Sequence, residues 1–148
     1  MTTLEQCPAR HVVYVSSGAV YDGLRGAVSP ETPVSPRLPY AISKLASEQY
    51  LRFFAERKGT VDSYINVRFF GAYGPYEAAR KITTRWLEGM AAGQREFVVR
   101  GDGRHLIDFM YVDDAVDGFL AAVKAAGDRR TVDFASGSPI SVNDVVQA

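Results

Sequence analysis

Two short apolar runs on either side of a helix-forming stretch most constrain the fold of this 148-residue chain. The first, His11–Val15, is rich in β-branched residues and is bounded by Ser-Ser-Gly, as in a strand buried on both faces of a parallel sheet. Residues Tyr40–Lys58 are rich in helix formers, and Gly59 supplies a stop. A second run, Asp62–Phe70, predicts another buried strand. This order indicates an α/β fold with a mainly parallel sheet.

The alternation continues along the rest of the chain. The pattern predicts a helix over 80–92, strands over 96–100 and 106–112, a helix over 113–126, a strand over 131–135 and a helix over 141–148. Ser141 is the expected N-cap of the last helix. Glycines and prolines break every period over residues 22–39, which predicts a long loop of the kind that is functional or disordered.

Composition narrows the classes of partner. Lys+Arg and Asp+Glu both number 17, so no net charge steers the chain toward nucleic acid or acidic lipid. The N-terminus is polar where a signal peptide needs an apolar stretch, and no run reaches the ~18 apolar residues of a membrane span. We therefore expect a cytoplasmic protein with small-molecule or protein partners. Cys7 has no disulfide partner and is expected to be an idle thiol. His11 and His105 lack a metal-ligand pattern, so no metal is expected.

One pair of side chains indicates a candidate acid/base site. Tyr40 and Lys44 stand four residues apart directly after Pro39, on one face of the first helical turn. A nearby ammonium favours the phenolate form of a tyrosine, which makes the phenol usable as a base. Ser16 and Ser17 end the first strand, at the carboxyl edge of the sheet where ligands collect. The alternative interpretation is an ordinary helix surface with an exposed lysine and a half-buried tyrosine.

A complete dinucleotide-binding fold begins with a strand and a G-x-G-x-x-G turn that binds the pyrophosphate. This sequence contains no such turn. The nearest candidate, Gly101-Asp-Gly103, lacks the third glycine and is better interpreted as a connecting turn. The chain therefore looks like the second half of a larger fold.

Five motifs, in the same order, resemble the extended short-chain dehydrogenase/reductase family, that is, the nucleotide-sugar epimerases, dehydratases and reductases. The motifs are Val15-Ser-Ser-Gly-Ala-Val-Tyr21, Pro39-Tyr-Ala-Ile-Ser-Lys44, Arg68-Phe-Phe-Gly-Ala-Tyr-Gly-Pro75, Gly101-Asp-Gly103 with Asp108-Phe-Met-Tyr-Val-Asp-Asp114, and Asp133-Phe-Ala-Ser-Gly137. The resemblance implies a partial Rossmann-like doubly wound parallel sheet with part of a small C-terminal substrate-binding region. Residues 1–75 would hold the second half of the dinucleotide-binding domain with the catalytic Ser, Tyr and Lys, and 76–148 the partial substrate-binding region with returning Rossmann elements.

The resemblance also implies roles for individual residues. Tyr40 falls on the general acid/base, Lys44 on the residue that binds the nicotinamide ribose, and Ser17 on the hydroxyl that binds the reacting sugar oxygen. The cofactor would be NAD or NADP, with NAD preferred, and the substrate a nucleotide sugar. The implied cofactor-binding residues are Ser16, Tyr40, Lys44, Phe70 and Tyr73, and the implied substrate-binding residues are Ser17, Gly18, Gly71 and Arg80. Trp86 is expected to serve packing, and Tyr111-Val-Asp113 to lead a strand into a helix.

The sequence departs from the family at the substrate side. The family's Asn before Val-Tyr-Gly-Pro is Gly71 here, and the Arg before Asp-Phe is Ile107; Arg68, Arg80, Lys81 or Arg104 are candidates to compensate. Dehydratases of the family carry Thr-Asp-Glu where this chain has Ser17-Gly-Ala19, which favours epimerase or reductase chemistry.

Two hypotheses follow. The first is the catalytic half of an NAD(P)-dependent nucleotide-sugar epimerase or reductase. The second is a non-catalytic remnant or interaction module whose sheet edge pairs with another chain. A regulator that only binds dinucleotide would not need Ser17, Tyr40 and Lys44 together. The resemblance also implies a homodimer, or a partner chain that supplies the missing half.

Overall fold

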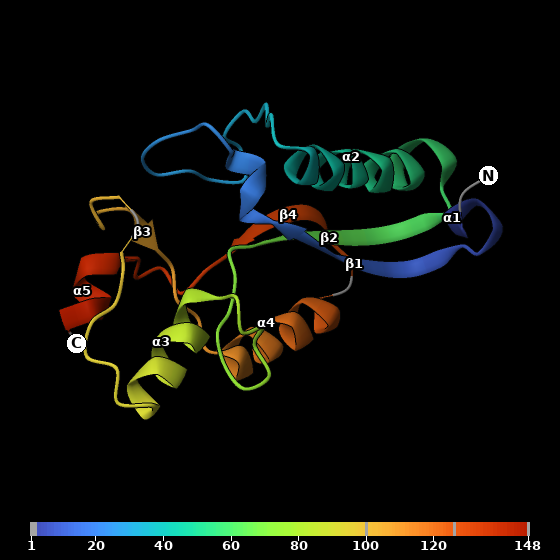
Figure 1. Ribbon diagram of the computed structural model, residues 1–148. Helices are drawn as coiled ribbons and strands as arrows, with labels where there is room; N and C mark the ends of the chain where they lie inside the picture. Colours follow the sequence, from blue (N-terminus) through green and yellow to red (C-terminus); the bar gives the residue numbers. More distant parts are fainter. Residues whose placement is uncertain (1–2, 100, 126, 148) are drawn as a thin grey trace. The chain divides into compact units, whose positions relative to one another are not determined.

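A computed structural model describes residues 3–99, 101–125 and 127–147 (Figure 1). The chain divides into two compact units. Unit 1 comprises Met1–Gly71 and Val116–Phe134, and unit 2 comprises Ala72–Ala115 and Ala135–Ala148.

Unit 1 is built on a three-stranded parallel sheet with the order β1-β2-β4. The strands are β1 (Ala9–Ser17), β2 (Val61–Phe69) and β4 (Arg129–Phe134). Their final residues, Ser17, Phe69 and Phe134, are register partners, so all three strands end at one edge. The predicted parallel sheet and its three strands are confirmed. A short helix that was not predicted, α1 (Thr3–Gln6), precedes β1.

Helices lie on both faces of this sheet. α2 (Pro39–Phe53) lies on one face, and the part of α4 (Val112–Lys124) that belongs to unit 1 lies on the other (Figure 1). Pro39 occupies the start of α2, where its missing N–H costs nothing. The helix continues into one π-helical turn, η2 (Phe54–Lys58), and ends at Gly59 with φ 64°. The predicted helix and its glycine stop are confirmed, and the predicted loop before it contains no strand or α-helix between Asp22 and Leu38.

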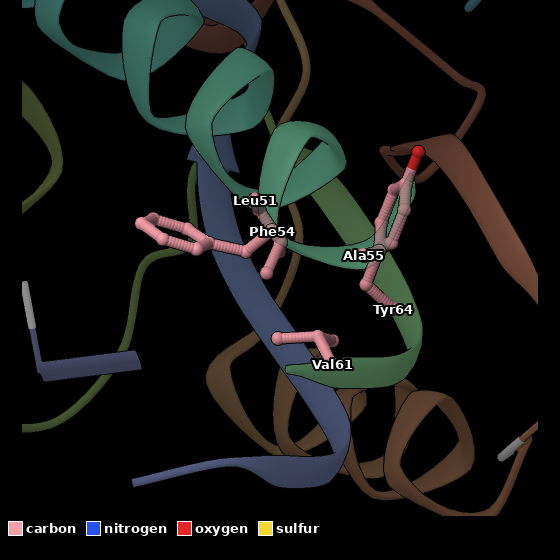
Figure 2. Packing of buried hydrophobic residues seen from close by; sticks show 5 residues of the cluster. All are labelled: Leu51, Phe54, Ala55, Val61 and Tyr64. Atoms are coloured by element: carbon pink, nitrogen blue, oxygen red, sulfur yellow. The ribbon is translucent and has the colours of Figure 1, made fainter. Parts of the chain in front are cut away.

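The core of unit 1 lies between the end of α2 and the start of β2. Leu51 comes from α2, Phe54 and Ala55 from η2, and Val61 and Tyr64 from β2; all five are buried (Figure 2). Val12 and Tyr14 of β1 pack against this cluster. Burial of these apolar side chains holds α2 on the sheet, at about 25 cal/mol per Å² removed from water.

Unit 2 contains α3 (Ile82–Ala91), β3 (Leu106–Ile107), β5 (Ile140–Ser141) and α5 (Val142–Gln147). β3 and β5 form an antiparallel pair. The N-cap prediction is confirmed, because the Ser141 Oγ accepts a hydrogen bond of 3.1 Å from the backbone N–H of Asp144. Gly101-Asp-Gly103 is a turn, as predicted, with positive φ at both glycines.

One strand prediction in this unit is wrong, and another is too long. Residues 94–99 form no strand, because none of the described strands pairs with them; the Phe97 ring packs edge-on against Trp86 of α3, and Arg100 lies outside the described residues. The strand predicted over 106–112 ends at Ile107. Asp108 turns the chain there by accepting hydrogen bonds from the backbone N–H groups of Ser136 and Gly137.

The predicted helix ends also need adjustment. The helix predicted over 113–126 is α4, which begins one residue earlier and ends at Lys124; residue 126 lies outside the described part of the chain, as does 148 at the end of the last predicted helix. Asp113 and Asp114 stand in the first turn of α4, where acidic groups suit the helix dipole. Within residues 3–99, 101–125 and 127–147, no helix has the length and apolar character needed to cross a bilayer.

Candidate active site at the carboxyl edge of the sheet

Ser17 is fixed where β1 ends. Its backbone is extended, with φ −146° and ψ 145°, and it caps the short 3-10 helix η1 (Gly18–Tyr21). The Ser17 Oγ accepts a hydrogen bond of 3.1 Å from the backbone N–H of Ala19. A hydroxyl has one donor and two acceptor positions, so the Ser17 proton can still be donated to a ligand oxygen.

Tyr40 and Lys44 come together on the first turns of α2. The Lys44 Nζ lies 5.7 Å from the centre of the Tyr40 ring and 5.2 Å from that of Tyr14. It donates a hydrogen bond of 2.8 Å to the backbone carbonyl of Val15, two residues before Ser17. Tyr40 is 57% exposed, so its phenol is open to a ligand. The structure therefore places a cation beside a phenol at the end of β1.

Four further predicted site residues belong to unit 1. Ser16 is buried, and its hydroxyl donates a hydrogen bond of 2.5 Å to Glu48, so the rest of the site can reach only its main chain. Gly18 packs against Phe70 so closely that an added Cβ would lie 2.8 Å from the ring. Phe70 itself is 39% exposed. Gly71 has φ 128°, a backbone angle that favours glycine.

Tyr73 and Arg80 belong to unit 2. Tyr73 is held by backbone hydrogen bonds with Met110 and Val112 and by ring contacts with Phe109 and Tyr111. Arg80 lines a cavity of about 820 Å³. The cavity is also lined by α3 and by the segment after it, including Arg85, Trp86, Phe97, Val99 and His105. Trp86 thus packs on Phe97, as predicted, and lines a cavity as well.

A buried polar network next to the site was missed by the sequence analysis. Arg68 of β2 forms an ion pair of 2.8 Å with Glu48 of α2, and both side chains are 6% exposed. Arg68 also donates to the Tyr21 hydroxyl at 2.8 Å, and the Tyr21 oxygen lies 2.8 Å from Asp133 Oδ1. The signal that could have found Glu48 is its spacing, four residues after Lys44 on the same helix face.

Burial and neighbouring charges shift the pKa values of two groups in this network. Burial raises the pKa of Tyr21 to about 12; the hydrogen bond from Arg68 acts in the opposite direction, and Asp133 adds to the rise. Burial alone would lower the pKa of Arg68, but its hydrogen bonds to Glu48 and Tyr21 outweigh that effect and raise it. Arg68 therefore stays positively charged in the interior of unit 1. It is not available to replace the substrate-side arginine that the family has at the position of Ile107.

The groups at this edge suit one end of a dinucleotide. An ammonium has three N–H donors, and the Val15 carbonyl takes one, so Lys44 retains donors for ribose hydroxyls. The exposed Phe70 ring offers an apolar surface for a nicotinamide. The sequence has no glycine-rich turn for the pyrophosphate, so the fit extends to the nicotinamide riboside end only. In the described part of the chain, no group of three or more His, Cys, Asp or Glu side chains could hold a metal ion.

The parallel sheet with helices on both faces defines a Rossmann-like α/β fold, and comparison with known proteins agrees. The sequence pattern of the NAD dependent epimerase/dehydratase family matches residues 1–134. The chain belongs to this family.

The similar proteins are nucleotide-sugar enzymes by name. UDP-glucose 4-epimerase of Mycolicibacterium smegmatis is 31% identical over 141 residues, which cover 92% of this chain and 44% of that protein. Human dTDP-D-glucose 4,6-dehydratase is 30% identical over 114 residues, covering 76% of this chain and 31% of that protein. The chain thus spans less than half the length of these relatives.

Solved structures give the same picture. MoeE5 in complex with UDP-glucuronic acid and NAD superposes with a TM-score of 0.82 at 33% identity, covering 97% of this chain and 49% of that chain. UDP-glucuronic acid 4-epimerase of Bacillus cereus, in complex with UDP-glucuronic acid and NAD, superposes with a TM-score of 0.84 at 25% identity, covering 97% and 46%.

Proposed function

We propose that the chain is the catalytic portion of an NAD-dependent epimerase or reductase that acts on a nucleotide-activated sugar. The observation that carries this proposal is the position of Lys44, whose ammonium is tied to the end of β1 beside the exposed phenol of Tyr40. Carboxyl edges of parallel strands are where open α/β folds bind ligands. NAD in the complexes of MoeE5 and the Bacillus cereus epimerase supports the choice of cofactor.

Each residue has a separate task in the reaction. Tyr40 accepts the proton of a sugar hydroxyl, and the Lys44 ammonium favours the phenolate that makes this possible. Ser17 donates a hydrogen bond to the same sugar oxygen and holds it beside Tyr40. NAD, when bound, supplies the hydride acceptor for the carbon that carries this hydroxyl. Tyr40 then returns the proton when the hydroxyl is restored.

Unit 2 has candidate ligand-binding residues of its own. Arg80 and Arg85 line the cavity of this unit and suit phosphate groups, and the rings of Trp86 and Phe97 in the same cavity suit a nucleotide base. UDP-sugars bound to MoeE5 and to the Bacillus cereus epimerase support this substrate class. Epimerase or reductase chemistry is preferred over dehydration, because Gly18 and Ala19 carry no acid or base for the loss of water.

A homodimer is part of the proposal. The outer side of α2 exposes Ile42, Tyr50 and Phe53, three large apolar side chains on one element. A second copy would remove this surface from water.

A second candidate function is a non-catalytic module that pairs with another chain. The observation that favours it is the position of β1 at the edge of the sheet, where a strand from another chain could add. The enzyme proposal predicts that NAD and a nucleotide sugar bind, whereas the second candidate predicts that neither binds.

Mass spectrometry of the protein as purified separates them. For the chain joined to a dinucleotide-binding segment that contains a glycine-rich turn, the enzyme proposal predicts co-purified NAD or nucleotide sugar, and a rise in melting temperature on addition of both. Lys44→Met should weaken the NAD-dependent rise, while Lys124→Met, at an exposed position on α4, should not. A protein that carries neither ligand and shows no shift with either would favour the second candidate.

A further inference from the structure

One row of residues crosses the sheet just before its carboxyl edge. Ser16 of β1 is the register partner of Arg68 of β2, and Arg68 is the register partner of Asp133 of β4. Side chains in register point to the same face of a sheet, and the neighbouring Phe69 and Phe134 point to the other. Phe69 and Phe134 contact Phe119 of α4, so the Ser16, Arg68 and Asp133 row faces α2.

Glu48 of α2 closes over this row. Its Oε1 accepts hydrogen bonds from the Ser16 hydroxyl at 2.5 Å and from the Arg68 Nε at 3.0 Å, and its Oε2 accepts from the Arg68 Nη2 at 2.8 Å. Glu48 and Arg68 are both buried. A two-point bond between a carboxylate and a guanidinium fixes the angle as well as the distance. The Glu48 carboxylate is thus held in one orientation over two strands.

This bond acts on the helix that carries the site. Glu48 follows Lys44 by four residues and Tyr40 by eight, so all three lie on one face of α2. On the strand, Ser16 follows Val15, which accepts the Lys44 hydrogen bond. Two consecutive residues of β1 therefore hold two consecutive turns of the same helix face.

We propose that Glu48 and Arg68 are positioning residues, which set the rotation of α2 so that Lys44 reaches the Val15 carbonyl and Tyr40 stands at the sheet edge. The inference rests on the proposed function, since the positions of Tyr40 and Lys44 affect activity only if Tyr40 is the acid/base and Lys44 assists it. It gives Arg68 a task inside the fold, away from substrate phosphate. A purely stabilising pair would leave the surroundings of Lys44 unchanged when weakened.

The test is NMR of the ε-methylene group of lysine in the isotope-labelled, ligand-free chain. The sequence has four lysines, Lys44, Lys58, Lys81 and Lys124, so the signals can be resolved, and Lys44→Arg assigns the one of interest. Two tyrosine rings lie beneath the Lys44 Nζ, so its ε-methylene signal is expected upfield of that of an exposed lysine.

Glu48→Gln keeps the shape of the side chain but turns an amide donor toward the donors of Arg68. We expect the Lys44 signal to move most of the way to the shift of an exposed lysine. Ser16→Ala removes one tie without leaving a charge unpaired, and should move the signal part of the way. Arg68→Lys keeps the charge but loses the two-point bond, and should behave like Ser16→Ala. The control is Val61→Ala, which weakens the core at the other end of β2 and should leave the Lys44 signal in place.

An unmoved Lys44 signal in folded Glu48→Gln would overturn the inference. If Glu48→Gln does not fold, an unmoved signal in Ser16→Ala overturns it in the same way. The NMR readout needs no turnover, so its outcome does not depend on the proposed function. The proposed function has its own test: normal turnover by Tyr40→Phe would refute it, whatever the Lys44 signal does.

Discussion

At the scale of single residues, Tyr21 shows how the interior depends on the ionisation of one group. Its hydroxyl accepts from Arg68 and points its proton toward Asp133 and the Ser29 carbonyl, each at 2.8 Å. Burial raises its pKa to about 12 from the ordinary 10.0. The folded state therefore holds this proton more tightly than the unfolded chain does.

The first prediction concerns pH. Because the folded pKa is the higher one, the stabilisation from Tyr21 is complete below about pH 10 and is lost as the pH rises through about 12. Tyr21→Phe lacks this group. The difference in free energy of unfolding between wild type and Tyr21→Phe should therefore be largest at pH 8–9 and shrink above pH 10, as measured by urea denaturation. A difference that stays constant to pH 11.5 would contradict the assignment.

The site itself could be predicted only in part from the sequence. The spacing of Tyr40 and Lys44 is local, and helix geometry alone brings their side chains together. The Val15 carbonyl and the Tyr14 ring, which also contact Lys44, lie about 30 residues away along the chain and become neighbours only through the packing of α2 on β1. The contact of Tyr21 with Asp133 depends on the register of β4, which no local pattern encodes.

At the scale of elements, the glycine at position 118 lets α4 approach the sheet. An added Cβ there would lie 2.1 Å from the tip of the Phe134 ring. Gly118→Ala gains about 1 kcal/mol in helix propensity but must displace this ring, at a cost of about 1–3 kcal/mol. We expect a net loss of stability in urea denaturation. Gly118→Ala combined with Phe134→Leu, which shortens the side chain in the way, should recover it. A stabilised single variant would show that the ring moves freely.

Helices and strands with a clear local sequence pattern could be predicted from the sequence. Strands that form only where a neighbouring strand is available could not. β1, α2 and β2 have long apolar or helix-forming runs with clear stops. Residues 96–99 have the apolar composition of a strand, but Phe97 packs on Trp86, and Gly89 makes room for its ring. A strand needs a neighbour for its ladder, and the sequence does not say where the neighbour is.

At the scale of the whole molecule, the Glu48–Arg68 pair joins α2 to strands β1 and β2 of unit 1. Arg68→Met leaves a buried carboxylate without its cation, so we expect the free energy of unfolding to fall by about 3–5 kcal/mol. Glu48→Leu together with Arg68→Met removes both charges and should recover much of the loss. Urea denaturation of the two variants and the wild type measures this. A single variant within about 1 kcal/mol of wild type would contradict the burial of the pair.

The proposed homodimer gives a second prediction at this scale. Phe53→Glu places a charge on the exposed apolar side of α2 and should shift the protein to a monomer in analytical ultracentrifugation. Leu120→Glu, at an equally exposed apolar position on α4, is the matched control and should leave the assembly unchanged. Dissociation by both variants alike would argue against α2 as the interface.

The most direct test of the central claim compares two tyrosines of the same helix. The chain is joined to a dinucleotide-binding segment that contains a glycine-rich turn, and conversion of a UDP-sugar with NAD is followed by liquid chromatography. Tyr40→Phe should lower turnover by at least about 100-fold, the contribution expected of a positioned acid/base, and leave NAD binding intact. Tyr50→Phe, which removes a hydroxyl from an exposed tyrosine further along α2, should turn over like wild type. Wild-type turnover by Tyr40→Phe would contradict the claim that this phenol moves the proton.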